Sequence, residues 1–243
     1  MFDCLAEPDA LALPLHTVSP AGLDALRQGL PAGAAGFLDA SGFTGRAQEV
    51  ALLPGDGGII GAVLGLGEAA PSPWSFGGLS QSLPAGSAWR LAEPAGIAAD
   101  AVLGWCLGAY RFSRFKVPKR APARLVPPPG TEVAQQAAAA AWRARDLINL
   151  PANLLGPAEL AAAVQELAAA HGGDCTIIED EALATGFPAL AAVGAGSPRA
   201  PRVAMLEWGH PAAPLVALCG KGVCFDTGGL DLKPSAGMLR MKK

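Results

Sequence analysis

The sequence is poor in charged residues, and neither sign dominates. Asp, Glu, Lys and Arg make up 16% of the 243 residues, and the formal net charge is −3. Lys and Arg are scattered along the chain, so the sequence offers no basic stripe of the kind that binds phosphate backbones. Nucleic acid is therefore not a predicted partner.

Long hydrophobic runs are also missing, although hydrophobic residues make up 51% of the chain. The longest apolar stretches, such as residues 59–66 and 215–219, fall far short of the roughly 20 residues that a membrane-crossing helix needs. The N-terminus lacks a basic region followed by an apolar one, the pattern of a secretory signal peptide. We expect no membrane span and a cytoplasmic protein.

Cysteine and histidine are few, and their spacing does not suggest a metal site. The cysteines are an odd number and none belongs to a C-x-x-C pair, so we predict reduced, mostly buried thiols and neither a disulfide framework nor a zinc knuckle. The histidines share no ligand spacing either, so each is expected at the surface or satisfied in the core. The residues are Cys4, Cys106, Cys175, Cys219, Cys224, His16, His171 and His210.

The first 115 residues predict an N-terminal α/β domain. Short apolar runs broken by Pro and Gly predict strands, whereas longer segments with apolar residues at helical intervals predict helices. The expected strands are residues 10–18, 50–53 and 59–66, the expected helices are 22–30 and 97–115, and the Pro-, Ser- and Gly-rich residues 68–86 are expected to form surface loops.

A Pro-rich stretch at residues 116–130 predicts a linker, because its prolines prevent a helix from passing through. Residues 131–243 then read as a second α/β domain, in which alternating helices and strands favour a mixed, mostly parallel sheet. The expected helices are residues 131–148, a helix that Pro157 starts, and 179–190; the expected strands are 175–178, 202–208 and 214–219.

The most informative segment is residues 215–238, in which a predicted apolar strand runs into a Gly-rich loop carrying four charged residues. Loops at strand ends are where α/β proteins place ligands, and glycines let the backbone approach a ligand closely. The charged residues are Lys221, Asp226, Asp231 and Lys233. The alternative is a surface loop whose charges are simply solvated.

Two nucleotide-binding motifs are disfavoured. A phosphate-binding G-x-x-x-x-G-K-[ST] loop would require Gly in place of Leu215 and Ser or Thr in place of Gly222. Residues 194–196 begin like a dinucleotide turn, but Arg199 stands where the third glycine of G-x-G-x-x-G belongs. A nucleotide-binding α/β protein is therefore the weakest of the functions considered.

The sequence GKGVCFDTGGLDLKPSAGM at residues 220–238 resembles the active-site loop of the leucyl (cytosol) aminopeptidase family. ARDLINLPANLLGP at residues 144–157 resembles the opening of the family's catalytic domain, and VGAGS at residues 193–197 resembles its next shared stretch. The resemblance covers roughly residues 104–243 and implies a metalloprotease, a hydrolase that releases leucine-like N-terminal residues from peptide substrates. It also implies a homohexamer.

Carried over residue by residue, the resemblance implies separate roles for the residues of this loop. Lys221 would bind one metal ion through a neutral amine, and Asp226 would bridge two divalent ions, Zn or Mn with Mg possible. Lys233 would stay protonated and act as a catalytic residue that stabilises the developing oxyanion. Met241 would line the substrate pocket, although a Met at this position is equally expected as an ordinary core residue. Asp231 is interpreted as a solvated carboxylate.

The family's remaining carboxylate ligands and its arginine are expected beyond Lys243. We therefore expect a fragment that is inactive alone. The alternative function is a non-catalytic binding or assembly module.

Overall fold

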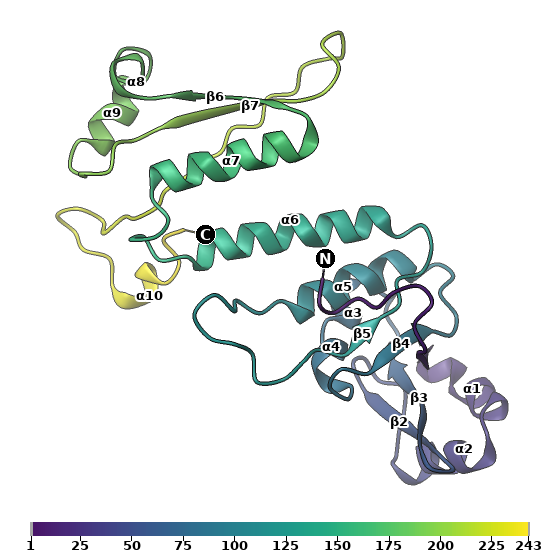
Figure 1. Ribbon diagram of the computed structural model, residues 1–243. Helices are drawn as coiled ribbons and strands as arrows, with labels where there is room; N and C mark the ends of the chain where they lie inside the picture. The colour runs from purple at the N-terminus through teal and green to yellow at the C-terminus, as the bar shows by residue number, and fades with distance from the viewer. Residues whose placement is uncertain (1, 243) are drawn as a thin grey trace. The chain divides into compact units, whose positions relative to one another are not determined.

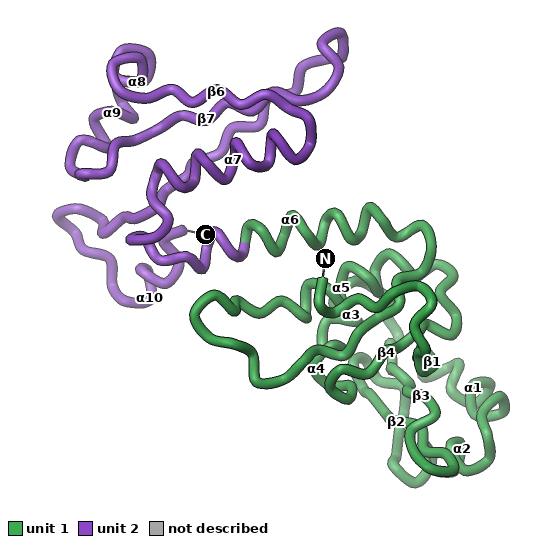
Figure 2. The backbone as a smooth tube through the Cα atoms, viewed as in Figure 1, with its two compact units in different colours: residues 1–144 green, residues 145–243 purple. Residues whose placement is uncertain are grey.

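The structure, a computed structural model, describes residues 2–242; Met1 and Lys243, the last residue of the predicted site segment, lie outside the described residues. The chain divides into two compact units, residues 1–144 and residues 145–243, called unit 1 and unit 2 below (Figure 2). Among the described residues, no helix is both long enough and apolar enough to cross a membrane.

Unit 1 is built on a five-stranded sheet with the order β2-β3-β1-β4-β5 (Figure 1). The strand β1 pairs in parallel with β3 and with β4, β4 pairs in parallel with β5, and only β2 runs antiparallel to its neighbour β3. The sheet is therefore mixed and mostly parallel, which confirms the predicted α/β class. The strands are β1 (Leu13–Val18), β2 (Val50–Gly55), β3 (Gly58–Gly65), β4 (Ala88–Leu91) and β5 (Arg124–Leu125).

Helices cover both faces of this sheet. Side chains alternate along β3, so that Ala62 and Leu64 join one apolar cluster while Val63 joins another. The larger cluster contains the buried Trp89 and Trp105, and the indole of Trp105 donates a hydrogen bond to the Ala123 carbonyl over 3.1 Å. The helical elements are a 3-10 turn (Pro20–Gly22), α1 (Leu23–Gly29), α2 (Ala32–Ala40), α3 (Pro73–Phe76), α4 (Leu79–Ser82) and α5 (Ala98–Ala109).

Two predictions for unit 1, one of a loop and one of a helix, need correction. Residues 68–86 are not only surface loops, because α3 and α4 lie within them and bury Phe76, Leu79 and Leu83 in the core. The helix predicted to run to residue 115 ends at Ala109, where Tyr110 turns extended and the Arg111 guanidinium donates to the Gly108 and Tyr110 carbonyls. Those bonds satisfy carbonyls that a helix end leaves without partners.

The end of the Pro-rich stretch belongs to the sheet of unit 1. Arg124 and Leu125 form the edge strand β5, and Ala123, Leu125 and Val126 are buried. The two compact units divide at Ala144, inside α6 (Glu132–Asn149). The domain boundaries 1–115, 116–130 and 131–243 stay a prediction.

Unit 2 contains the end of α6, followed by α7 (Pro157–His171) and the strands β6 (Asp174–Ile178) and β7 (Val203–Glu207). The strands pair antiparallel, and α7 packs against both. Pro157 opens α7 as predicted, the Glu159 carboxylate accepts from the Gly156 N–H over 2.9 Å, and Gly172 ends the helix at φ +67°. The helix predicted at 179–190 is two helices, α8 (Asp180–Gly186) and α9 (Pro188–Gly194), because Pro188 starts a new one.

The strand predicted at residues 214–219 is wrong. The segment has no regular structure, and the exposed fractions of Leu215 and Leu218 are both 94%. A β-strand needs a neighbour for its backbone hydrogen bonds, and this segment pairs with none of the described strands. An apolar composition alone therefore does not make it a strand.

Close packing of α5 against α3 generates a stability prediction. A Cβ on Gly104 would lie 1.9 Å from the Pro73 carbonyl oxygen, whereas a Cβ on Gly36 in α2 would meet nothing within 4 Å. We expect Gly104→Ala to lower the free energy of unfolding by about 1–3 kcal/mol through overpacking. Gly36→Ala should leave it unchanged or raise it by up to about 1 kcal/mol, because Ala favours helix over Gly. Urea unfolding monitored by tryptophan fluorescence measures both, and equal midpoints for the two variants would contradict the packing argument.

Candidate metal and substrate site

The candidate site is a loop, residues 226–233, that is shaped by its own short-range hydrogen bonds. The Asp226 carboxylate accepts from the Gly228 N–H over 2.9 Å, and the Thr227 carbonyl accepts from the Lys233 N–H over 2.8 Å. Gly228 has φ +94°, and a Cβ there would lie 2.3 Å from the Asp231 carbonyl oxygen. Glycine is therefore required at this turn by both its backbone angle and its space.

The loop brings together Asp226 and Lys233, two of the predicted site residues. The Lys233 ammonium pairs with the second oxygen of the Asp226 carboxylate and also lies 3.4 Å from its backbone carbonyl. The hydrogen bond from Lys233 lowers the pKa of Asp226, the Gly228 N–H lowers it further, and the charges of Lys233 and Lys221 act in the same direction. Asp226 is therefore an ionised carboxylate at neutral pH.

The other two predicted site residues make fewer contacts. Lys221 is exposed, and among the described residues its side chain has no hydrogen bond or ion pair, although its charge acts on Asp226. Met241 is half-buried just after the short helix α10 (Ser235–Met238), and its N–H donates to the Met238 carbonyl over 3.3 Å. Its role in a substrate pocket stays a prediction.

The donor chemistry of the loop fits part of a divalent-metal ligand set. Asp226 offers an ionised carboxylate whose two oxygens accept from the Gly228 N–H and the Lys233 ammonium. Lys221 lies five residues earlier on the same segment, and its side chain makes no hydrogen bond or ion pair among the described residues. Across residues 2–242, however, no three His, Cys, Asp or Glu side chains gather closely enough to hold a metal ion. Lys221 and Asp226 therefore need further ligands to complete a site.

A cluster of polar contacts around Arg199 lies earlier in the chain than the loop. The Arg199 guanidinium donates to the Ala152 carbonyl over 2.6 Å and pairs with the Glu159 carboxylate. The sequence did not predict this cluster. It drew attention to Arg199 only because that residue stands where a dinucleotide-binding turn would have its third glycine. The contact joins residues 47 and 40 positions apart, which no local pattern reveals.

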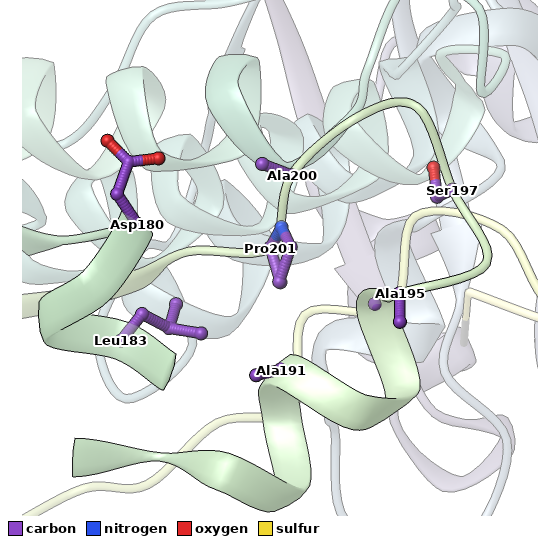
Figure 3. Close-up of a pocket in the computed structure, with 8 residues that line it drawn as sticks. Asp180, Leu183, Ala191, Ala195, Ser197, Ala200 and Pro201 are labelled. Carbon is purple, nitrogen blue, oxygen red and sulfur yellow. The ribbon is translucent and has the colours of Figure 1, made fainter. Parts of the chain in front are cut away.

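Two shallow depressions lie near this cluster, and neither is lined by Lys221, Asp226 or Lys233. One, of about 440 Å³, includes Arg199 and Phe225, the residue before Asp226. The other, of about 260 Å³, lies between α8 and α9 and is lined by Asp180, Leu183 and Pro201 among others (Figure 3). The three charged residues of the candidate site are therefore part of neither depression.

Comparison with known proteins identifies the family. Residues 13–128 match the N-terminal domain of M17 aminopeptidases, and residues 142–243 match the catalytic domain of the cytosol aminopeptidase family. The chain belongs to the cytosol aminopeptidase family. The catalytic-domain match contains the whole of the candidate loop.

Relatives found by sequence and by structure agree with this family assignment. A probable cytosol aminopeptidase of Methylorubrum populi is 36% identical, with 82% of this chain and 46% of the relative covered; one of Nocardia farcinica is 38% identical, covering 84% and 45%. The crystal structure of the cytosol aminopeptidase from Coxiella burnetii has a TM-score of 0.90 at 35% identity and covers 99% of this chain and 54% of that one.

A further structural relative was solved with metal. The bottromycin maturation enzyme BotP in complex with Mn has a TM-score of 0.75 at 32% identity, covering 93% of this chain and 51% of BotP. The chain thus spans about half the length of the curated and structural relatives that it matches.

The Asp226–Lys233 pair generates a pH prediction. Because the folded pKa of Asp226 lies below its unfolded value of about 3.9, the pair stabilises the loop above that pH and loses its effect as pH falls through the folded pKa. Lys233→Ala should raise the pKa of Asp226 toward its ordinary value, and Lys233→Arg should keep it low. Carboxyl-carbon NMR titration measures this, with Lys221→Ala as the control expected to shift it less. An Asp226 pKa that is the same in all three variants would rule out the pair.

Proposed function

We propose that this chain is part of a metal-dependent aminopeptidase that releases leucine-like N-terminal residues from peptides. The single observation that carries the proposal is the loop in which an ionised Asp226 and a paired Lys233 lie within the segment matching the family's catalytic domain. Membership of the cytosol aminopeptidase family supports the reaction class. Peptides are the proposed substrates.

In this proposal Lys221 and Asp226 hold metal, together with ligands that the described residues do not supply. Asp226 suits a bridging position because it is anionic and has two oxygens. Lys221 must be neutral to bind, and a nearby dication favours its deprotonated amine. Two divalent ions, zinc or manganese with magnesium as a further candidate, would supply a hydroxide-like nucleophile and polarise the first peptide carbonyl. The Mn complex of BotP supports manganese as a candidate.

Lys233 is the proposed catalytic residue, because a fixed ammonium favours the negative charge that develops on the carbonyl oxygen during attack. Its pairing with Asp226 holds the side chain within the loop that matches the family's catalytic domain. Met241 is proposed to line the pocket for the substrate's first side chain. A cytoplasmic homohexamer is the proposed form of the whole protein, a proposal that rests on family membership alone.

Metal removal tests the reaction class. We expect a full-length protein carrying this chain to hydrolyse leucine amide, to lose that activity after stripping with a chelator, and to regain it with Mn²⁺ or Zn²⁺. Product release measured by chromatography gives the result. Undiminished activity in the stripped protein would refute the metal assignment. No hydrolysis even in the metal-loaded protein would favour a non-catalytic binding or assembly module.

Lys233→Ala tests the electrostatic role separately from metal binding. In the same full-length protein, the variant should retain its metal while kcat falls by roughly 10²–10³, the usual loss when one oxyanion-stabilising group is removed. Asp226→Asn is the matched variant and should lose metal as well as turnover. Metal content by plasma mass spectrometry, measured beside kcat, separates the two effects. Full turnover in Lys233→Ala would exclude the catalytic role.

A further inference from the structure

Lys242 reaches the C-terminal end of α6, although it is more than 90 residues away in sequence. Its ammonium donates to the Leu147 carbonyl over 3.4 Å and to the Leu150 carbonyl. Figure 1 shows the C-terminal segment, in yellow, returning to this end of α6. The contact therefore joins the last described residue to the start of unit 2.

The helix end offers Lys242 a site that α6 does not fill by itself. The last carbonyls of a helix have no intrahelical donors and carry partial negative charge, so a cation is favoured there. The last turn of α6 contains no basic residue. Within residues 2–242, the half-buried Lys242 has no carboxylate partner, and its only polar contacts are these backbone carbonyls.

Lys242 also lies beside the proposed site. It follows Met241 directly, and its charge acts on the Cys224 thiol, two residues before Asp226. The charge of Lys242 therefore acts on the segment just before Asp226, while its hydrogen bonds lie at the end of α6.

We propose that Lys242 is a positioning residue, which fixes the site segment on the end of α6 and so holds Met241 at the substrate's first side chain. It touches no reacting atom in this role. The proposal rests on the proposed function, because it assigns Met241 to the substrate pocket. It adds a residue that acts through the backbone carbonyls of Leu147 and Leu150.

Three variants in a full-length, metal-loaded protein test the proposal. Lys242→Met keeps the length of the side chain and removes its charge, Lys242→Arg keeps a donor cation, and Arg240→Met removes a neighbouring exposed charge that makes no side-chain bond among the described residues. In Lys242→Met we expect KM for leucine amide to rise about tenfold with kcat changed less than about twofold, because a misplaced positioning group weakens binding. Lys242→Arg should restore most of the affinity, and Arg240→Met should match wild type.

A second readout does not depend on activity. Cys224 is half-buried and Cys219 is exposed on the same segment, so their relative rates of alkylation report whether the segment is held. The Cys224 to Cys219 ratio, measured by peptide mass spectrometry, should rise several-fold in Lys242→Met and stay at the wild-type value in Lys242→Arg and Arg240→Met. Wild-type KM and an unchanged ratio in Lys242→Met would overturn the proposal, as would failure of Lys242→Arg to rescue. If the wild-type protein hydrolyses nothing, the proposed function fails, whereas the ratio still decides whether Lys242 holds the segment.

Discussion

Hydrogen bonding along both edges of β1 is the interaction on which unit 1 depends. Paired with β3 on one side and β4 on the other, β1 directs Leu15 into one apolar cluster and Val18 into the other. The helices pack onto faces that this pairing creates. The helix α5 approaches α3 closely because Gly104 leaves room for the Pro73 carbonyl.

Unit 2 also contains paired strands, but its sheet has only the two strands β6 and β7 among the described residues. β6 and β7 pair only with each other, and the apolar residues 214–219 stay irregular although their composition suits a strand. The candidate loop is therefore not positioned by a sheet edge in the described residues. Its shape comes from Asp226, Thr227 and Lys233, which bond within eight residues of one another. A local sequence motif can encode such a loop completely.

Features that depend on short-range contacts could be predicted from the sequence, whereas features that depend on distant contacts could not. The start of α7 was predictable because Pro157 and Glu159 act within one turn, and the loop was predictable because its bonds are short-range. The helices α3 and α4 were missed because Pro, Ser and Gly dominate residues 68–86; the local signal was Ser72, whose N–H donates to the Ser75 hydroxyl over 3.3 Å. The contacts of Lys242 and Arg199 were missed for another reason. Each joins distant segments, and no residue pattern near either one specifies its partner.

Asp226 links the two roles that the proposed function assigns to lysines. One of its oxygens is paired with the Lys233 ammonium, and in the proposal the same carboxylate would also hold metal. An oxygen given to a dication is a weaker partner for an ammonium that repels the same dication. Lys233 would then favour another negative atom, and the oxyanion that develops on the substrate carbonyl is such an atom. Lys221, which is exposed and without a carboxylate partner among the described residues, has no competing interaction to lose on becoming a neutral ligand. Asp226 thus pairs with only one of the two lysines among the described residues, the one to which the proposal assigns the oxyanion.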